Sequence, residues 1–95
     1  MRLADFVIKF LEEKAIDTVF TVSGGGSIYL CDALYKSKKL KYVSCHHEQA
    51  VSFAAESYSR VKNKPGAAII TTGPGGTNCT TGVACCWIDS VPTIF

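Results

Sequence analysis

The sequence predicts an α/β fold in which alternating βαβ units form a parallel sheet with helices on both faces. Two patterns in the sequence indicate this fold, and the composition indicates a globular domain. Short β-branched and apolar runs alternate with longer segments whose apolar residues recur at helical spacing. Glycine-rich turns follow several of the strand-like runs. The chain has 95 residues, of which 47% are hydrophobic and 19% charged, so it fits one small globular domain rather than a disordered segment.

The first half of the chain is expected to contain two helices and two strands. An amphipathic first helix is predicted by apolar residues at helical spacing, expected on its buried face: Leu3, Phe6, Val7, Phe10 and Leu11. Residues 18–22 are β-branched and aromatic and predict a short buried strand, which a glycine run ends. Residues 28–35 predict the second helix, and residues 41–45 the second strand.

The second half continues the alternation. An alanine-rich third helix is expected over residues 48–61, followed by a third strand over 67–72. A Gly-Pro-Gly-Gly turn then leads into a fourth helix over about 77–89, and residues 92–95 begin a fourth strand. Because that strand has no turn or cap after it, we expect residues 1–95 to be the front part of a larger α/β domain, truncated in a core strand.

Composition excludes several classes of protein. A net charge of +2 gives no reason to expect binding to nucleic acid or to an anionic membrane surface. Residues 65–88 carry no charge, but their glycines and prolines favour a buried strand, turn and helix over a membrane span. The five cysteines include no CxxC pair, and the N-terminus lacks a signal-peptide pattern, so we expect a reducing, cytoplasmic location.

The ends of the predicted strands are the places to look for chemistry, because ligands of parallel sheets bind at the carboxyl ends of strands. Three segments follow strands: residues 23–26, 45–48 and 73–78. Neither glycine turn matches GxGxxG or the phosphate-binding Walker loop. Cys45 and His47 have no second ligand pair at a zinc-like spacing, so no metal site is predicted.

Glu48 is the candidate acid–base residue, because it opens a helix directly after a strand. It could be an exposed glutamate that the helix dipole favours. If it points into the crevice beside the glycine turns, burial would raise its pKa and make it a proton donor and acceptor near neutrality. The dipole acts in the opposite direction, so the sequence leaves the net shift open.

An ordered series of motifs carries a family resemblance over nearly the whole chain. The motifs are Val19-Phe20-Thr21-Val22-Ser23-Gly24-Gly25, His46-His47-Glu48-Gln49, Ser57-Tyr58-Ser59-Arg60, Asn63-Lys64-Pro65-Gly66, Thr72-Gly73-Pro74-Gly75-Gly76-Thr77-Asn78 and Asp89-Ser90-Val91-Pro92. Together they resemble the N-terminal, pyrimidine-binding domain of thiamine diphosphate enzymes, in particular the acetolactate synthase pattern. Thr21, Ser23, His46 and Ser57 depart from that pattern, and related enzymes act on other 2-oxo acids.

The resemblance implies roles for five residues. Glu48 matches the glutamate that bonds the pyrimidine N1′ and shares its proton, which leads to a carbanion nucleophile on the cofactor. Pro74 and Asn78 match positions beside the cofactor rings, and Gly24 and Gly25 match the loop near the reacting centre.

The resemblance also implies what lies outside this chain. In the family a C-terminal domain binds the diphosphate and Mg²⁺, and each active site lies between two subunits. We therefore expect this chain to supply half of the active site of a transferase or lyase that acts on a small 2-oxo acid. The full-length enzyme is expected to be a homodimer or homotetramer, and the isolated chain to be inactive. The alternative is a non-catalytic α/β binding or regulatory module.

Overall fold

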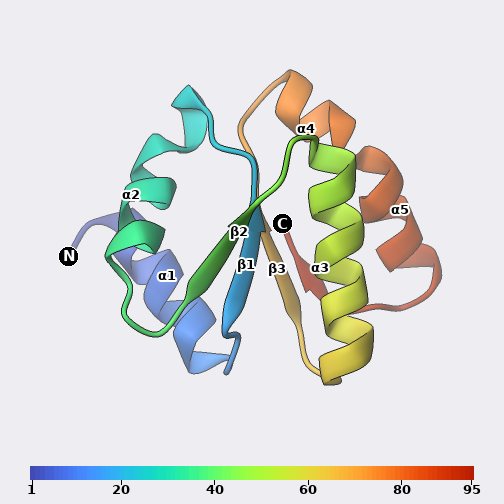
Figure 1. Ribbon diagram of the computed structural model, residues 1–95, viewed down its shortest axis with the longest axis horizontal. Coiled ribbons are helices and arrows are strands. Elements are labelled where there is room, and N and C mark those ends of the chain that lie inside the picture. The colour runs from blue at the N-terminus through green and yellow to red at the C-terminus, as the bar shows by residue number, and fades with distance from the viewer.

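The structure is a computed structural model that describes all residues, Met1–Phe95. Its four strands are β1 (Thr18–Thr21), β2 (Lys41–Ser44), β3 (Gly66–Ile69) and β4 (Thr93–Ile94). They form one sheet in the order β2-β1-β3-β4, and every neighbouring pair is parallel (Figure 1). The expected parallel sheet is thus confirmed, and the carboxyl ends of β1, β2 and β3 lie at one edge.

Helices cover both faces of this sheet, as predicted. Helices α1 (Leu3–Glu13) and α2 (Ile28–Lys36) pack on one face, where Ile8, Leu34 and Val19 belong to the larger buried cluster. Helix α3 (Glu48–Lys62) covers the other face, where Val51 and Ala55 pack with Ala68 of β3. The order of elements along the chain therefore places the start of α3 at the carboxyl edge of the sheet.

The last helical segment differs from the prediction. In place of one helix over about 77–89, the structure has α4 (Pro74–Asn78) and α5 (Thr80–Ile88), joined at Cys79. Proline is favoured in the first turn of a helix, because its φ is already helical and it needs no donor there. Gly73 precedes it with a φ of 66°, a conformation that favours glycine. The Gly-Pro pair therefore starts a helix three residues earlier than expected, and α5 lies beside α3 (Figure 1).

The buried face of α1 also differs. The structure buries Ala4, Ile8 and Leu11, whereas Leu3 and Phe6 are 80% and 56% exposed. The helix carries two overlapping apolar stripes, and spacing alone does not say which one faces the sheet. The structure selects the stripe that begins at the small Ala4, which lies in one buried cluster with Ala33 and Leu34 of α2.

The remaining boundaries are close to those expected. Strand β3 ends at Ile69 rather than at residue 72, because its partner β1 ends at Thr21, which pairs with Ile69. A short 3₁₀ helix, η1 (Gly25–Ser27), precedes α2. The uncharged residues 65–88 form a strand, a turn and two helices, and no helix of the structure has the length and apolarity needed to span a bilayer.

Candidate functional site

The segments after β1, β2 and β3 meet at one edge of the sheet, as predicted. Two hydrogen bonds join them across the edge. The Gly26 N–H, in the turn after β1, donates to Thr71 Oγ1, after β3, over 3.1 Å. The Asn78 amide Nδ2, at the end of α4, donates to Glu48 Oε2, at the start of α3, also over 3.1 Å. Each bond connects residues that are at least 30 positions apart in the sequence.

Glu48 owes its position to the turn that starts α3. His47 is the N-cap residue of this helix, with extended backbone, and its Nδ1 accepts the Gln49 backbone N–H over 3.0 Å. This cap fixes the entry into the first turn, where Glu48 lies half-buried with its carboxylate near Gly75. Sequence reasoning gave His47 no such structural role, although a capping residue before a helical run is a known signal.

In the structure, hydrogen bonding outweighs burial in its effect on the pKa of Glu48. The Asn78 amide, and after it the backbone N–H of Glu48 itself, hold the pKa of the Glu48 carboxyl below its usual value. Burial acts in the opposite direction and is outweighed. Glu48 is therefore an ionised carboxylate near neutral pH, an acceptor for a proton or for an N–H donor.

Pro74 and Asn78 belong to the same short helix, α4. Pro74 is its first residue and is exposed, and Asn78 is its last. The Gly73 carbonyl oxygen accepts both the Thr77 N–H and the Thr77 hydroxyl, which holds the turn together. The structure thus brings Pro74 and Asn78 to the same edge as Glu48, and it joins Asn78 to Glu48 directly.

Gly24 and Gly25 do not contact Glu48 directly; Gly24 packs against Thr71, which borders the site. Neither forms a hydrogen bond with Glu48 or Asn78, and Gly24 lies against the Thr71 side chain instead. A Cβ on Gly25 would meet nothing within 4 Å, so the space beside this turn is open. Sequence reasoning missed Thr71, although its position between a buried strand and a glycine turn is a usable signal.

We find no reactive thiol and no metal-binding cluster near Glu48. Burial raises the pKa of the Cys79 thiol, which therefore stays protonated and is a poor nucleophile. No group of three or more His, Cys, Asp or Glu side chains is close enough together to hold a metal ion. The acidic centre at this edge is thus the single carboxylate of Glu48.

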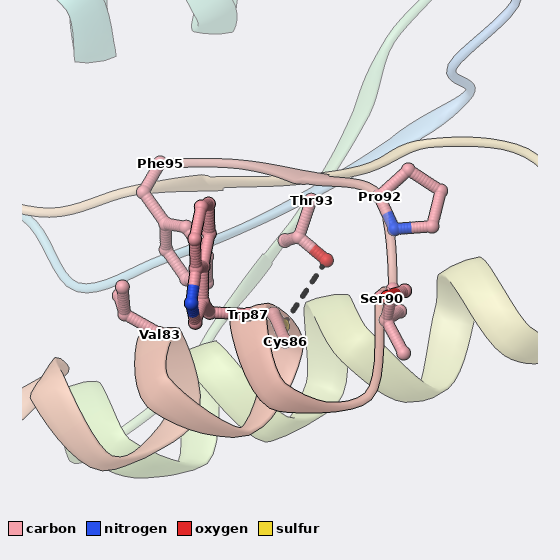
Figure 2. A pocket seen from close by; sticks show the side chains of 8 residues that line it. Val83, Cys86, Trp87, Ser90, Pro92, Thr93 and Phe95 are labelled. Carbon is pink, nitrogen blue, oxygen red and sulfur yellow. Dashed lines mark hydrogen bonds between the residues drawn. The ribbon is translucent and has the colours of Figure 1, made fainter.

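The largest cavity lies elsewhere, between α5 and β4, and has a volume of about 510 Å³. Figure 2 shows its lining, in which Trp87 and Cys86 come from α5 and Phe95 from the end of the chain. The Cys86 thiol donates to Thr93 Oγ1 over 3.3 Å, and no charged side chain lines the cavity. It shares no residue with the edge that holds Glu48.

The residues at the edge fit the ring of a flat heterocyclic cofactor. Glu48 Oε2 is bonded to Asn78, whereas no side chain donates to Oε1, which lies 3.6 Å from the position of a Cβ on Gly75. A Cβ on Gly25 or on Gly73 would meet nothing within 4 Å, so each turn leaves part of its backbone open. A ring N–H could therefore approach a half-exposed carboxylate without a side chain in its way.

The comparison with protein families decides the identity of the domain. The model of the family described as "Thiamine pyrophosphate enzyme, N-terminal TPP binding domain" matches residues 1–95, the whole chain. The chain belongs to this family. Thiamine pyrophosphate is another name for thiamine diphosphate, so the resemblance seen in the sequence is confirmed.

Named relatives of this thiamine pyrophosphate enzyme domain are acetolactate synthases. The chain is 43% identical over 91 residues to "Acetolactate synthase 3, chloroplastic" of Brassica napus, covering 96% of this chain and 14% of that protein. It is 41% identical to "Acetolactate synthase" of Mycobacterium leprae, covering 96% of this chain and 15% of that protein. The "Acetolactate synthase large subunit" of Lactococcus lactis is 33% identical, with 96% and 16% covered. The domain thus spans only 14–16% of the length of these relatives.

Proposed function

We propose that this domain is the N-terminal, pyrimidine-binding part of a thiamine diphosphate-dependent transferase or lyase that decarboxylates a 2-oxo acid and ligates the product, as an acetolactate synthase does. The observation that carries the proposal is the position of Glu48, whose carboxylate is bonded to Asn78 and borders Gly75 at the carboxyl edge of the sheet. The three relatives named above, each an acetolactate synthase, support the substrate class.

In this proposal five residues hold the pyrimidine side of the cofactor. Glu48 would share a proton with the pyrimidine N1′, which a neutral amide at this position would not do. Asn78 keeps the Glu48 carboxylate oriented and ionised through its amide. Pro74, Gly24 and Gly25 border the rings and the reacting centre. When bound, thiamine diphosphate would supply the carbanion nucleophile for chemistry on a 2-oxo acid.

The proposal also requires parts that lie outside these 95 residues. A C-terminal domain would bind the diphosphate through Mg²⁺, and a partner subunit would complete each active site, in a homodimer or homotetramer. The proposed compartment is the cytoplasm, which keeps unpaired thiols reduced, although the plant relatives are named as chloroplastic.

The test uses the full-length protein that contains this chain. After removal of bound cofactor, it is supplied with thiamine diphosphate and Mg²⁺, and release of CO₂ is measured from pyruvate and from longer 2-oxo acids. We expect saturable CO₂ release that depends on the cofactor. Absence of both cofactor binding and CO₂ release would contradict the proposal and favour the non-catalytic binding or regulatory module.

A further inference from the structure

Thr71 occupies the junction between the two glycine turns of the site. It lies half-buried two residues after β3, at the point where the chain leaves the sheet. Its hydroxyl oxygen accepts the Gly26 N–H over 3.1 Å. A Cβ on Gly24 would lie only 2.6 Å from the Thr71 methyl and 2.7 Å from its hydroxyl, so that turn packs its bare backbone against this one side chain.

The Thr71 methyl also faces the other turn. A Cβ on Gly75 would lie 2.8 Å from this methyl and 3.6 Å from Glu48 Oε1. Gly75 is buried, so the Thr71 methyl and the Glu48 carboxylate border the same small space around its backbone. One side chain therefore touches the turn after β1 with both its hydroxyl and its methyl, and the turn that carries Asn78 with its methyl alone.

We propose that Thr71 is a positioning residue for both turns: its hydroxyl and methyl together fix the turn at Gly24–Ser27, and its methyl also fixes Gly75 beside Glu48. This inference rests on the proposed function for its effect on turnover. The hydroxyl then controls the side of the site near the reacting centre. The methyl controls the geometry in which Glu48 meets the pyrimidine ring.

Two substitutions separate the two contacts. Thr71→Val keeps a branched side chain of the same shape but removes the acceptor of the Gly26 N–H. Thr71→Ser keeps the hydroxyl but removes the methyl that packs on both Gly24 and Gly75. A matched control is Thr21→Val, which removes another threonine hydroxyl, one that donates to the Ile69 carbonyl oxygen over 2.7 Å inside the sheet. Thr21 touches neither glycine turn through that bond, so this control reports general loss of stability.

The experiment measures three quantities in the full-length protein. They are amide hydrogen exchange of the peptide covering residues 23–27 in the cofactor-free protein, hydrogen–deuterium exchange at C2 of bound thiamine diphosphate, and kcat/KM for the 2-oxo acid. Thr71→Val should speed amide exchange in the turn and lower kcat/KM by about 3- to 10-fold, the range of one hydrogen bond, with C2 exchange unchanged. Thr71→Ser keeps the acceptor of the Gly26 N–H, so it should slow C2 exchange several-fold and speed amide exchange in the turn less than Thr71→Val does.

If Thr71 only stabilised the fold, its two variants would not differ in which of these exchange rates they change most. If both Thr71 variants change turnover and C2 exchange in the same proportion as Thr21→Val, the inference is wrong. It is also wrong if Thr71→Val leaves amide exchange of the turn at the wild-type rate. If the wild-type protein shows no C2 exchange of bound cofactor, the proposed function fails instead, while amide exchange still tells whether the Thr71 hydroxyl holds the turn.

Discussion

At the scale of single residues, the contact between Glu48 and Asn78 determines the state of the site. The Asn78 amide donates to one carboxylate oxygen of Glu48 and stabilises its charged form, which lowers the pKa of Glu48. Because this pKa is lower in the folded protein than in the unfolded chain, the contact contributes stability above the ordinary glutamate pKa. That contribution is lost as the pH falls through the lowered value.

Substitution of Asn78 by Ala should therefore raise the pKa of Glu48 toward its ordinary value. Asn78→Asp should raise it further, because a second negative charge would face the carboxylate. The measurement is a ¹³C NMR titration of the Glu48 carboxyl carbon in wild-type and variant proteins. A Glu48 pKa that stays the same in all three proteins would show that Asn78 does not control the charge of the site.

The sequence identified Glu48 but could not decide its charge. A glutamate directly after a strand and before a helical run marks the carboxyl edge of a parallel sheet, and this placement is local information. The lowered pKa depends on Asn78, thirty positions away, whose amide reaches Glu48 only because Gly73 and Pro74 start α4 early. Thr71 was missed for a similar reason, since its contacts with Gly26 and Gly24 exist only in three dimensions.

At the scale of elements, close packing of α5 against α3 depends on one glycine. A Cβ on Gly82 would overlap the Ser52 side chain, whose hydroxyl donates to the Gln49 carbonyl oxygen one turn earlier in α3. Both Gly82 and Ser52 are buried. The same helix α3 carries Glu48 at its start, so this packing also supports the position of the candidate site.

Gly82→Ala is expected to destabilise the protein by about 1–3 kcal/mol, the usual cost of overpacking a buried contact. The measurement is the change in the free energy of unfolding, or in Tm, relative to wild type. Gly25→Ala is the matched control, because a Cβ there meets nothing within 4 Å and its stability should change little. Equal stability of the Gly82→Ala variant and the control would mean that α5 does not pack on α3 as described.

Two element-level differences show what a sequence pattern leaves open. Of the apolar stripe predicted for α1, Leu11 is buried as expected, whereas Leu3, Phe6 and Phe10 are exposed. The sheet and α2 bury Ala4 and Ile8 in their place. The predicted fourth helix is two helices, because Cys79 interrupts the helical hydrogen bonds with an i to i−3 bond to Gly76. The alternation of strands with helices and the parallel pairing of the strands were predicted from the sequence pattern and are confirmed, whereas the order β2-β1-β3-β4 within the sheet was not predicted.

At the scale of the whole molecule, much apolar surface remains uncovered. Only 22 of the 95 residues are buried, whereas Trp87 and Ile88 of α5 are 87% and 76% exposed. Edge strand β2 is exposed at all four positions. A small parallel sheet with so little covered surface is at the lower limit of what one domain can stabilise.

We therefore expect the 95-residue chain, expressed alone, to be marginally stable and to self-associate. Calorimetry and analytical ultracentrifugation of the isolated chain test this expectation. A broad transition with association through exposed apolar side chains is the expected result. A sharp, cooperative melt of a monomeric protein would contradict it.

The central claim is that Glu48 shares a proton with the pyrimidine ring of thiamine diphosphate. The most direct test is hydrogen–deuterium exchange at C2 of the cofactor bound to the full-length protein, in wild type and in Glu48→Gln. The control is Glu56→Gln on the same helix, where the carboxylate pairs with Arg60 instead of facing the site. Loss of a general acid–base group typically costs about 10²–10⁴-fold, so Glu48→Gln should slow the exchange by at least about 100-fold and Glu56→Gln should leave it unchanged. Exchange at the wild-type rate in Glu48→Gln would reduce Glu48 to a residue at the start of a helix and contradict the proposed site.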